Sequence, residues 1–143
     1  NINRLGARPV EYINNMYGDN TGSTLHGTLP TDRFVVGWKL DREFSPLAGA
    51  ERPARGDADI PLVNPLDGAG SPVLDLSAST HSARVQIPRD MNDVPGAPSD
   101  ARLRWRMTVR DAMQSLFARG AAVTRFVRDV GDELPYYVVE ATR

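Results

Sequence analysis

The sequence predicts an α+β fold, in which a few strands pack against one long helix. Residues 32–40 alternate apolar and other side chains with the period of two that is typical of a β-strand. Residues 99–119 place apolar side chains along one stripe with the period of an α-helix. Shorter alternating segments flank that helix, so residues 77–143 predict a module with the order strand, helix, strand, strand.

The first segment predicts the end of a helix and then a strand. Residues 1–5 and Gly6 resemble a last helical turn closed by a glycine, whose backbone tolerates the left-handed conformation. One turn does not nucleate a helix by itself, so we expect a longer helix upstream and interpret the chain as a C-terminal half. Residues 8–17 alternate like a strand, and we expect them to pair antiparallel with residues 32–40.

Composition divides the chain into three parts. Residues 1–44 hold the first two predicted strands. Residues 45–76 are rich in Pro, Gly, Ala and Asp, which predicts a connector that runs over the surface, with short extended pieces near 61–64 and 72–76. Residues 77–143 form the second module.

Within that module the strands and the helix have clear limits. Strands are predicted at 83–88, 121–128 and 134–141, packed on the helix. The helix is expected to start at Ser99, whose side chain suits an N-cap, and to end before Gly120.

Composition also excludes several classes of protein. The 143 residues carry a net charge of −1, which gives no general attraction to nucleic acid or to an anionic membrane. The absence of cysteine excludes disulfides and thiol catalysis. No apolar run approaches the roughly 20 residues of a membrane helix, so we expect a cytoplasmic protein. Without a phosphate loop, a paired-histidine spacing or a Ser-His-Asp motif, no catalytic, cofactor-binding or metal-binding residue is assigned.

The polar loop before residues 32–40 supplies the candidate substrate-binding residues. His26, Asp32 and Arg33 lie in or beside a loop rich in Thr and Gly that leads into the clearest strand. An aspartate and an arginine together could hold the ammonium and the carboxylate of an amino acid. The alternative is that Asp32 and Arg33 form a local salt bridge while His26 is solvated.

The arginines of the predicted helix suggest two interpretations. Arg102, Arg104, Arg106 and Arg110 could bind phosphate or nucleic acid. They spread over much of the helix circumference, and Asp100 and Asp111 dilute them, so we favour a solvated helix face.

Several phrases of the sequence resemble one protein family. The runs NINRLGA, EYINNMYG and LHGTLPTDRFVVGW, followed by ARVQIPRDMN, RWRMTVRDAMQSLFARGAAVTRFVRD and YYVVEATR, are similar in content and order to a bacterial branch of the GNAT superfamily of acetyltransferases. The resemblance covers residues 1–42 and 83–143. It implies the C-terminal strands of a GNAT-like mixed sheet over residues 1–44, followed by a C-terminal extension.

The resemblance implies an acyl-CoA-dependent N-acyltransferase with acetyl-CoA or another acyl-CoA as co-substrate. In such enzymes the CoA pyrophosphate binds a loop upstream of these residues, so this chain is not expected to bind CoA tightly. The tyrosine that protonates the thiolate commonly lies four residues before the glycine that matches Gly6. Ile2 stands there instead, so the resemblance supplies no tyrosine acid from that helix.

Two functions of different classes follow. The first is the acceptor side of an N-acyltransferase that acts on a small amine, with an amino acid as the expected acceptor. The second is a non-catalytic module, on a degenerate GNAT scaffold, that serves dimerisation, lid formation or partner binding.

Overall fold

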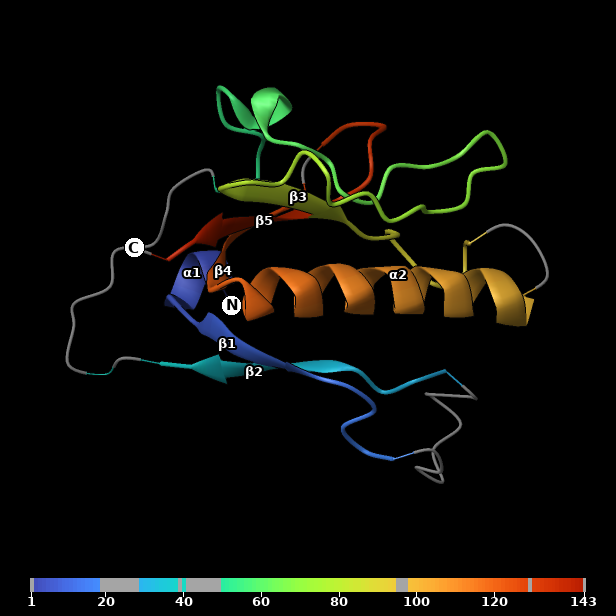
Figure 1. Ribbon diagram of the computed structural model, residues 1–143, viewed down its shortest axis with the longest axis horizontal. Coiled ribbons are helices and arrows are strands. Elements are labelled where there is room, and N and C mark those ends of the chain that lie inside the picture. Colours follow the sequence, from blue (N-terminus) through green and yellow to red (C-terminus); the bar gives the residue numbers. More distant parts are fainter. Residues whose placement is uncertain are drawn as a thin grey trace.

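The chain folds as two antiparallel sheets with one long helix between them (Figure 1). The computed structural model describes residues 2–18, 29–38, 40, 50–94, 98–128 and 130–142, with the backbone alone at 98 and 99. Within this part of the chain the elements are α1 (Ile2–Leu5), β1 (Arg8–Ile13), β2 (Arg33–Gly37), the 3-10 helix η1 (Asp57–Asp59), β3 (Ser82–Gln86), α2 (Pro98–Ala118), β4 (Ala121–Val127) and β5 (Tyr136–Ala141). The predicted α+β class is confirmed.

The pairing of the strands follows the predicted scheme. β1 runs antiparallel to β2, with Arg8 opposite Gly37 and Ile13 opposite Arg33. The second sheet has the order β3-β5-β4, and both of its strand pairs are antiparallel. The strand predicted over residues 8–17 ends at Ile13, because residues 14–17 form a turn. The mixed, GNAT-like sheet stays a prediction.

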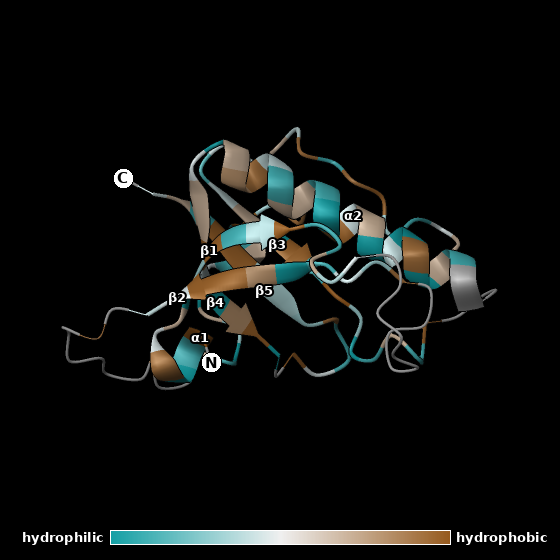
Figure 2. Ribbon diagram, turned by 90° about the horizontal axis from the view of Figure 1, so that it is seen from below, coloured by the Kyte–Doolittle hydropathy of each residue, from teal (hydrophilic) through white to brown (hydrophobic). Residues whose placement is uncertain are grey.

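The ends of α2 agree with the local signals for helix termination. Gly120 follows the helix with φ of 77°, a left-handed conformation that glycine adopts without steric cost. The predicted N-cap side chain of Ser99 lies outside the described residues. Bands of hydrophobic and hydrophilic residues alternate along α2 in Figure 2, as expected for a helix that is amphipathic.

The three-stranded sheet is buried on both faces, whereas the sequence predicted only that its strands pack on the helix. On the face toward α2, Val85, Val123 and Val139 pack with Met113 and Leu116 of the helix. The opposite face is covered by the connector, where Ile60 packs on a second cluster. That second cluster comprises Val127, Val130, Tyr136 and Val138. Successive side chains of β5 therefore enter opposite cores, which is the expected consequence of strand geometry.

The connector is part of the core rather than a purely surface segment. Val63 and Asn64 are completely buried, which contradicts the prediction that residues 45–76 run over the surface. The reason is a backbone ladder on the free edge of β3. Val63 N–H donates to the Arg84 carbonyl (3.0 Å), and Arg84 N–H donates to the Pro61 carbonyl (2.7 Å). Asn64 and Gln86 exchange three further buried hydrogen bonds.

Aromatic side chains join the first two strands to the rest of the molecule. The ring of Phe34 on β2 makes edge-on contacts with Tyr12 (5.2 Å between centroids), Tyr137 (5.4 Å) and Phe117 (6.3 Å). These partners belong to β1, β5 and α2. Such contacts stabilise beyond the burial of their area. The segments predicted as separate parts thus share one hydrophobic core, and α2 is covered by a sheet on either side (Figure 1).

α1 is fixed to the edge of the second sheet by one side chain. The Asn3 amide donates to the Phe126 carbonyl (2.6 Å) and accepts from the Phe126 N–H (3.0 Å). Asn3 is therefore buried although it lies on a helix of one turn.

Candidate functional site

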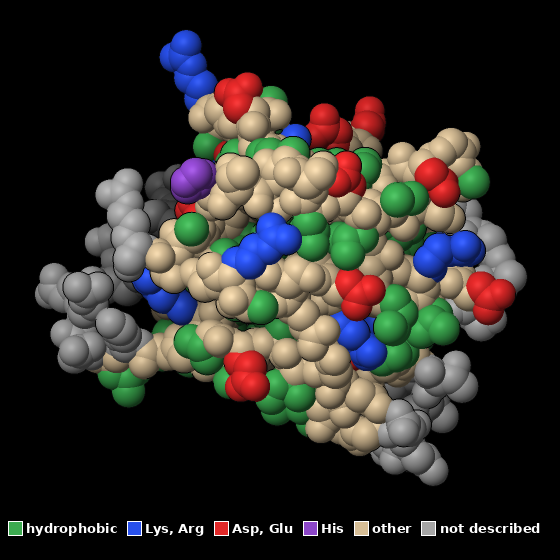
Figure 3. All heavy atoms as spheres, in the orientation of Figure 1, with side chains coloured by type: hydrophobic (Ala, Val, Ile, Leu, Met, Phe, Trp, Pro, Cys, Tyr) green, Lys and Arg blue, Asp and Glu red, His purple; other side chains and the backbone are tan. Residues whose placement is uncertain are grey.

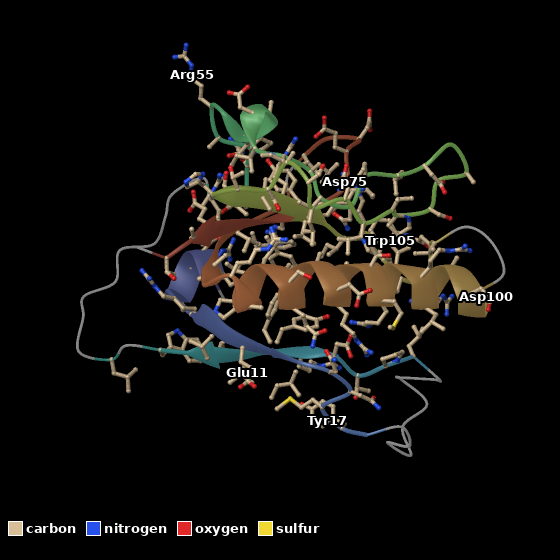
Figure 4. The ribbon with its side chains drawn as sticks, in the orientation of Figure 1. Glu11, Tyr17, Arg55, Asp75, Asp100 and Trp105 are labelled. Carbon is tan, nitrogen blue, oxygen red and sulfur yellow. The ribbon has the colours of Figure 1, made fainter. Side chains whose placement is uncertain are left out.

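A small cavity lies where the β1–β2 sheet and the three-stranded sheet both approach α2. Its volume is about 220 Å³, and it is lined by residues of β1, β2, the segment after β3, α2 and β5. The lining is mostly aromatic and aliphatic, with three charged side chains: Tyr12, Asp32, Arg33, Phe34, Ile87, Pro88, Met91, Trp105, Arg106, Val109 and Tyr137. Figure 4 shows Trp105 directed from α2 toward the segment that follows β3. Apolar walls with few charged groups are typical of small-molecule sites.

Asp32, on the wall of this cavity, belongs to a buried ion pair. The Arg110 guanidinium on α2 donates from Nε to Asp32 Oδ2 (2.9 Å) and from Nη2 to Asp32 Oδ1 (2.5 Å). The Asp32 side chain is completely buried, and that of Arg110 retains 15% of its accessible surface. Two parallel bonds between an arginine and a carboxylate fix both distance and orientation. The pair therefore ties the start of β2 to the middle of α2.

The turn after β1 completes the environment of Asp32. Asn15 N–H donates to Asp32 Oδ1 (2.9 Å), and the Asn15 side-chain oxygen accepts from Thr31 N–H (3.3 Å). Asn15 has φ of 47°, in the left-handed region that asparagine enters more readily than other L-residues. The side chain of Thr31 is held in the same network, since its hydroxyl accepts from Tyr17 N–H (3.1 Å).

The net effect of this environment is a stable Asp32 carboxylate. Burial by itself raises the pKa of Asp32, but the hydrogen bonds from Arg110 and from Asn15 N–H lower it more, so the pKa lies below its usual value. The hydrogen bond to Asp32 also raises the pKa of Arg110. Both groups are therefore charged at neutral pH, and each neutralises the other.

Arg106 is a cation of the cavity lining that forms no ion pair with the described residues. It lies one turn before Arg110 on the same side of α2, and it lines the cavity. Its Nε is buried and has no hydrogen-bond partner among the described residues. Leaving a buried donor unpaired costs roughly 1–3 kcal/mol. Arg102 Nε, a further turn earlier, is buried and unpaired in the same way.

Tyr12 is one of the two tyrosines that line the cavity, the other being Tyr137. Burial, together with the nearby charge of Asp32, raises the pKa of Tyr12 to about 12. Its hydroxyl lies 3.5 Å from Asp32 Oδ2, which makes a weak hydrogen bond at best. At neutral pH Tyr12 is therefore a neutral donor of hydrogen bonds and does not act as a base.

The residues predicted from the loop are only partly brought together. Asp32 and Arg33 both line the cavity, but they do not form the local salt bridge considered as the alternative. Instead Arg33 Nη1 donates to the Asp32 backbone carbonyl (2.8 Å), and its guanidinium lies over the Tyr17 ring at 5.6 Å. His26 lies outside the described residues. The role of these three residues in substrate binding stays a prediction.

The expectation of a solvated arginine face on α2 is wrong for Arg110 and incomplete for Arg106. Both side chains are partly buried, whereas Arg104 is exposed. The reason is the β1–β2 pair, which covers the side of α2 away from the three-stranded sheet. Arg102, Arg106 and Arg110 follow one another at intervals of four residues along the margin of the apolar stripe. That spacing is the signal by which the sequence could have indicated them.

A larger hollow exists elsewhere but offers less chemistry. It measures about 740 Å³ and lies beside α1 and the outer ends of β3, β4 and β5. Its walls are largely small residues such as Ala7, Ser82 and Ala122, and its polar side chains Arg8, His81 and Glu140 are exposed. The smaller cavity is the stronger candidate, because aromatic side chains and buried charges converge on it.

Metal sites and membrane-spanning helices are absent from the part of the chain that the structure describes. No group of three or more His, Cys, Asp or Glu side chains there could hold a metal ion. None of the helices described there has the length and the apolar character needed to cross a membrane. The chain matches no protein-family model, no curated protein and no solved structure.

Proposed function

We propose that this chain is the acceptor side of an acyl-CoA-dependent N-acyltransferase of the GNAT type, and that the 220 Å³ cavity receives a small amine. The observation that supports the proposal is the position of the cavity. Its polar wall is Asp32 and Arg33, which belong to the phrase of the sequence that resembles the entry to the final strands of that superfamily.

The residues of the cavity can bind and orient an acceptor. Aromatic rings exclude water from the walls, and Tyr12 offers a hydroxyl that stays protonated at neutral pH. Asp32 is not suited to remove a proton from the amine, because its carboxylate is already paired with Arg110. In the reaction the amine nitrogen bonds to the acyl carbon while the bond from that carbon to sulfur breaks, and the thiolate takes up a proton. We assign no residue to the proton transfers.

The co-substrate, acetyl-CoA or another acyl-CoA, is proposed to bind mainly upstream of these residues. The direct test is a panel of amines and acyl-CoAs assayed on the intact enzyme. Release of CoA that depends on a particular amine supports the proposal, and no release with any pair opposes it. In calorimetry, acetyl-CoA should not bind the 143-residue chain with micromolar affinity. Micromolar binding would contradict the placement of the CoA site upstream.

A second candidate is a non-catalytic module for dimerisation or partner binding. It is favoured by apolar side chains exposed around the first sheet, where Val10 is 61% and Trp38 48% exposed. Apolar side chains are visible over β1 and β2 in Figure 3. Analytical ultracentrifugation of the chain and of a Trp38→Arg variant distinguishes this role. A dimer that the substitution dissociates supports it, and a monomer at all concentrations opposes the dimer.

A further inference from the structure

We propose that the cavity binds the carboxylate of a small apolar acid, with Arg106 as the residue that pairs with the anion. The proposal rests on the proposed function in one respect, since an amino-acid acceptor would bring such a carboxylate into the same cavity. The binding itself requires no acyl donor.

The charges of the lining support an anion. Of the described residues that line the cavity, Asp32 is the one acid, and Arg110 already neutralises it through two hydrogen bonds. Arg33 and Arg106 are the lining cations. The wall therefore carries a net positive charge on partly buried side chains, and an anion is the ligand that such a wall stabilises.

Arg106 is distinguished from Arg33 and Arg110 by its unused hydrogen-bonding capacity, and from Arg102 by its place in the cavity lining. Arg110 binds Asp32, and Arg33 binds the Asp32 carbonyl and lies over Tyr17. Arg106 Nε has no partner within the described part of the chain, although water does not reach it. A guanidinium offers a fork of N–H groups that matches the two oxygens of a carboxylate. A carboxylate in the cavity would give Nε the partner that the described part of the chain does not provide.

The size and the walls of the cavity define the rest of the ligand. A volume of 220 Å³ corresponds to roughly seven water molecules in the liquid, which is too little for a nucleotide or for CoA. The remaining walls are Phe34, Trp105, Tyr137 and aliphatic side chains, which favour an apolar body next to the charged end. The ligand class is therefore a small monocarboxylate with an aromatic or branched aliphatic substituent.

Trp105 provides a direct reporter, since it lines the cavity. The chain contains two tryptophans, so a Trp38→Phe background leaves Trp105 as the single one. In this background, fluorescence titrations compare phenylacetate with its neutral isostere phenylacetamide. The unmodified cavity should bind phenylacetate at least about 10-fold more tightly, because only the anion gains the charged pair.

Variants at two arginines locate the effect. Arg106→Gln is expected to weaken phenylacetate binding about 10-fold or more and to leave phenylacetamide binding unchanged. Arg104→Gln is the matched control, because Arg104 is exposed on the same helix and does not line the cavity. Arg106→Lys retains the charge without the fork and should retain part of the preference. Equal affinity for the two ligands in the unmodified chain would overturn the proposal, and so would an equal loss in the Arg104 and Arg106 variants. The comparison within the unmodified chain remains decisive even where Arg106→Gln does not fold.

Failure of the carboxylate site and failure of the acyltransferase activity are distinguishable. If carboxylates bind as described but no amine is acylated by the intact enzyme, the acyltransferase proposal fails and the ligand class stands. If amines are acylated but carboxylates show no preference over amides, Arg106 does not pair with an anion in this cavity and the acyltransferase proposal is unaffected.

Discussion

Arg110 and Asp32 lie 78 residues apart in the sequence and form a two-point ion pair between α2 and the start of β2. The pair connects the first two strands to the module of residues 77–143. Because it is buried, its energetic role is mainly to penalise any arrangement in which one partner is left alone. This property gives the most direct test of the packing of the first sheet on α2.

Removal of one member of the pair should destabilise the protein strongly. Asp32→Asn is expected to lower the free energy of unfolding by about 3 kcal/mol, because Arg110 then remains charged and largely buried without its partner. Urea denaturation measures the change. Asp111→Asn is the matched control, since Asp111 is exposed on the same helix. If the double variant Asp32→Asn with Arg110→Gln loses as much as the sum of the single variants, the two side chains are not coupled.

Acid should lower the stability of the folded protein, because Asp32 and Asp57 take up protons. Both have a pKa below the usual value, because hydrogen bonds from arginine and from backbone N–H outweigh the effect of burial. The folded state therefore binds fewer protons than the unfolded chain at acid pH. The stabilisation is complete above the unfolded pKa of about 3.9, and it is lost as the pH falls through the lower folded values.

Urea midpoints measured between pH 7 and pH 3 check this expectation. The midpoint should change little from pH 7 to about pH 5 and fall below about pH 4. In the Asp32→Asn variant the fall should be shallower. A fall equally steep in variant and parent would contradict the part assigned to Asp32.

Removal of one hydrogen bond to η1 should lower the stability with which the connector is held on the three-stranded sheet. The Tyr136 hydroxyl donates to Asp57 Oδ2 (2.8 Å), and Asp57 also pairs with Arg125 of β4. Tyr136→Phe is expected to cost about 1–2 kcal/mol of stability, since the acceptor is charged. Burial and the Asp57 carboxylate hold the pKa of this tyrosine at about 12, so the result should not depend on pH near neutrality. Tyr137→Phe, on the opposite face of β5, is the control and should cost less; equal costs would oppose the prediction.

Gly120 should stabilise the protein at the end of α2 only through the backbone conformation that glycine permits. Gly120→Ala is expected to cost about 1 kcal/mol, because φ of 77° is unfavourable for alanine. A Cβ at Gly120 would meet no atom closer than 4.0 Å, so steric overlap does not contribute. Gly68→Ala, where a Cβ also meets nothing within 4 Å, should leave the melting temperature unchanged or raise it. Equal melting temperatures for the two variants would contradict the conformational explanation.

A substitution of Arg33 tests the substrate-binding role that the sequence predicted for the residues in and beside the polar loop. If the proposed acyltransferase activity is observed, Arg33→Ala should lower kcat/KM about 10-fold or more when the arginine contacts the acceptor, with little change in folding. Arg55→Ala is the control, because Arg55 extends away from the body of the protein (Figure 4). A lower melting temperature with unchanged kcat/KM would assign Arg33 a structural role.

The elements that depend on local pattern were predictable, and their assembly was not. Alternation and helical periodicity indicated β2, α2 and the strands around it, since these signals arise from neighbours in the sequence. The cover of α2 on two sides depends on contacts between distant segments, such as Phe34 with Phe117 and with Tyr137. The continuous apolar run at residues 136–139 was a usable signal for a strand buried on both faces, because alternation disappears when neither face meets water.

The sequence likewise predicted only some of the residues of the candidate site. The sequence indicated Asp32 and Arg33, which do line the cavity, because charged residues at the start of a strand stand out locally. It did not indicate Arg106, Trp105 or Tyr12 as their neighbours. Arginines on a helix resemble a solvated face until a second layer of structure covers them, and in this fold the β1–β2 pair does so.

The pairing of Asn3 with Phe126 also bears on how separate molecules meet. β4 is an outer strand of its sheet, and outer strands present unpaired N–H and C=O groups on which another chain can add a strand and begin to aggregate. The Asn3 amide occupies both backbone groups of Phe126, so a foreign strand finds neither a donor nor an acceptor at that position. One side chain from a helix of a single turn therefore protects the sheet edge against intermolecular pairing.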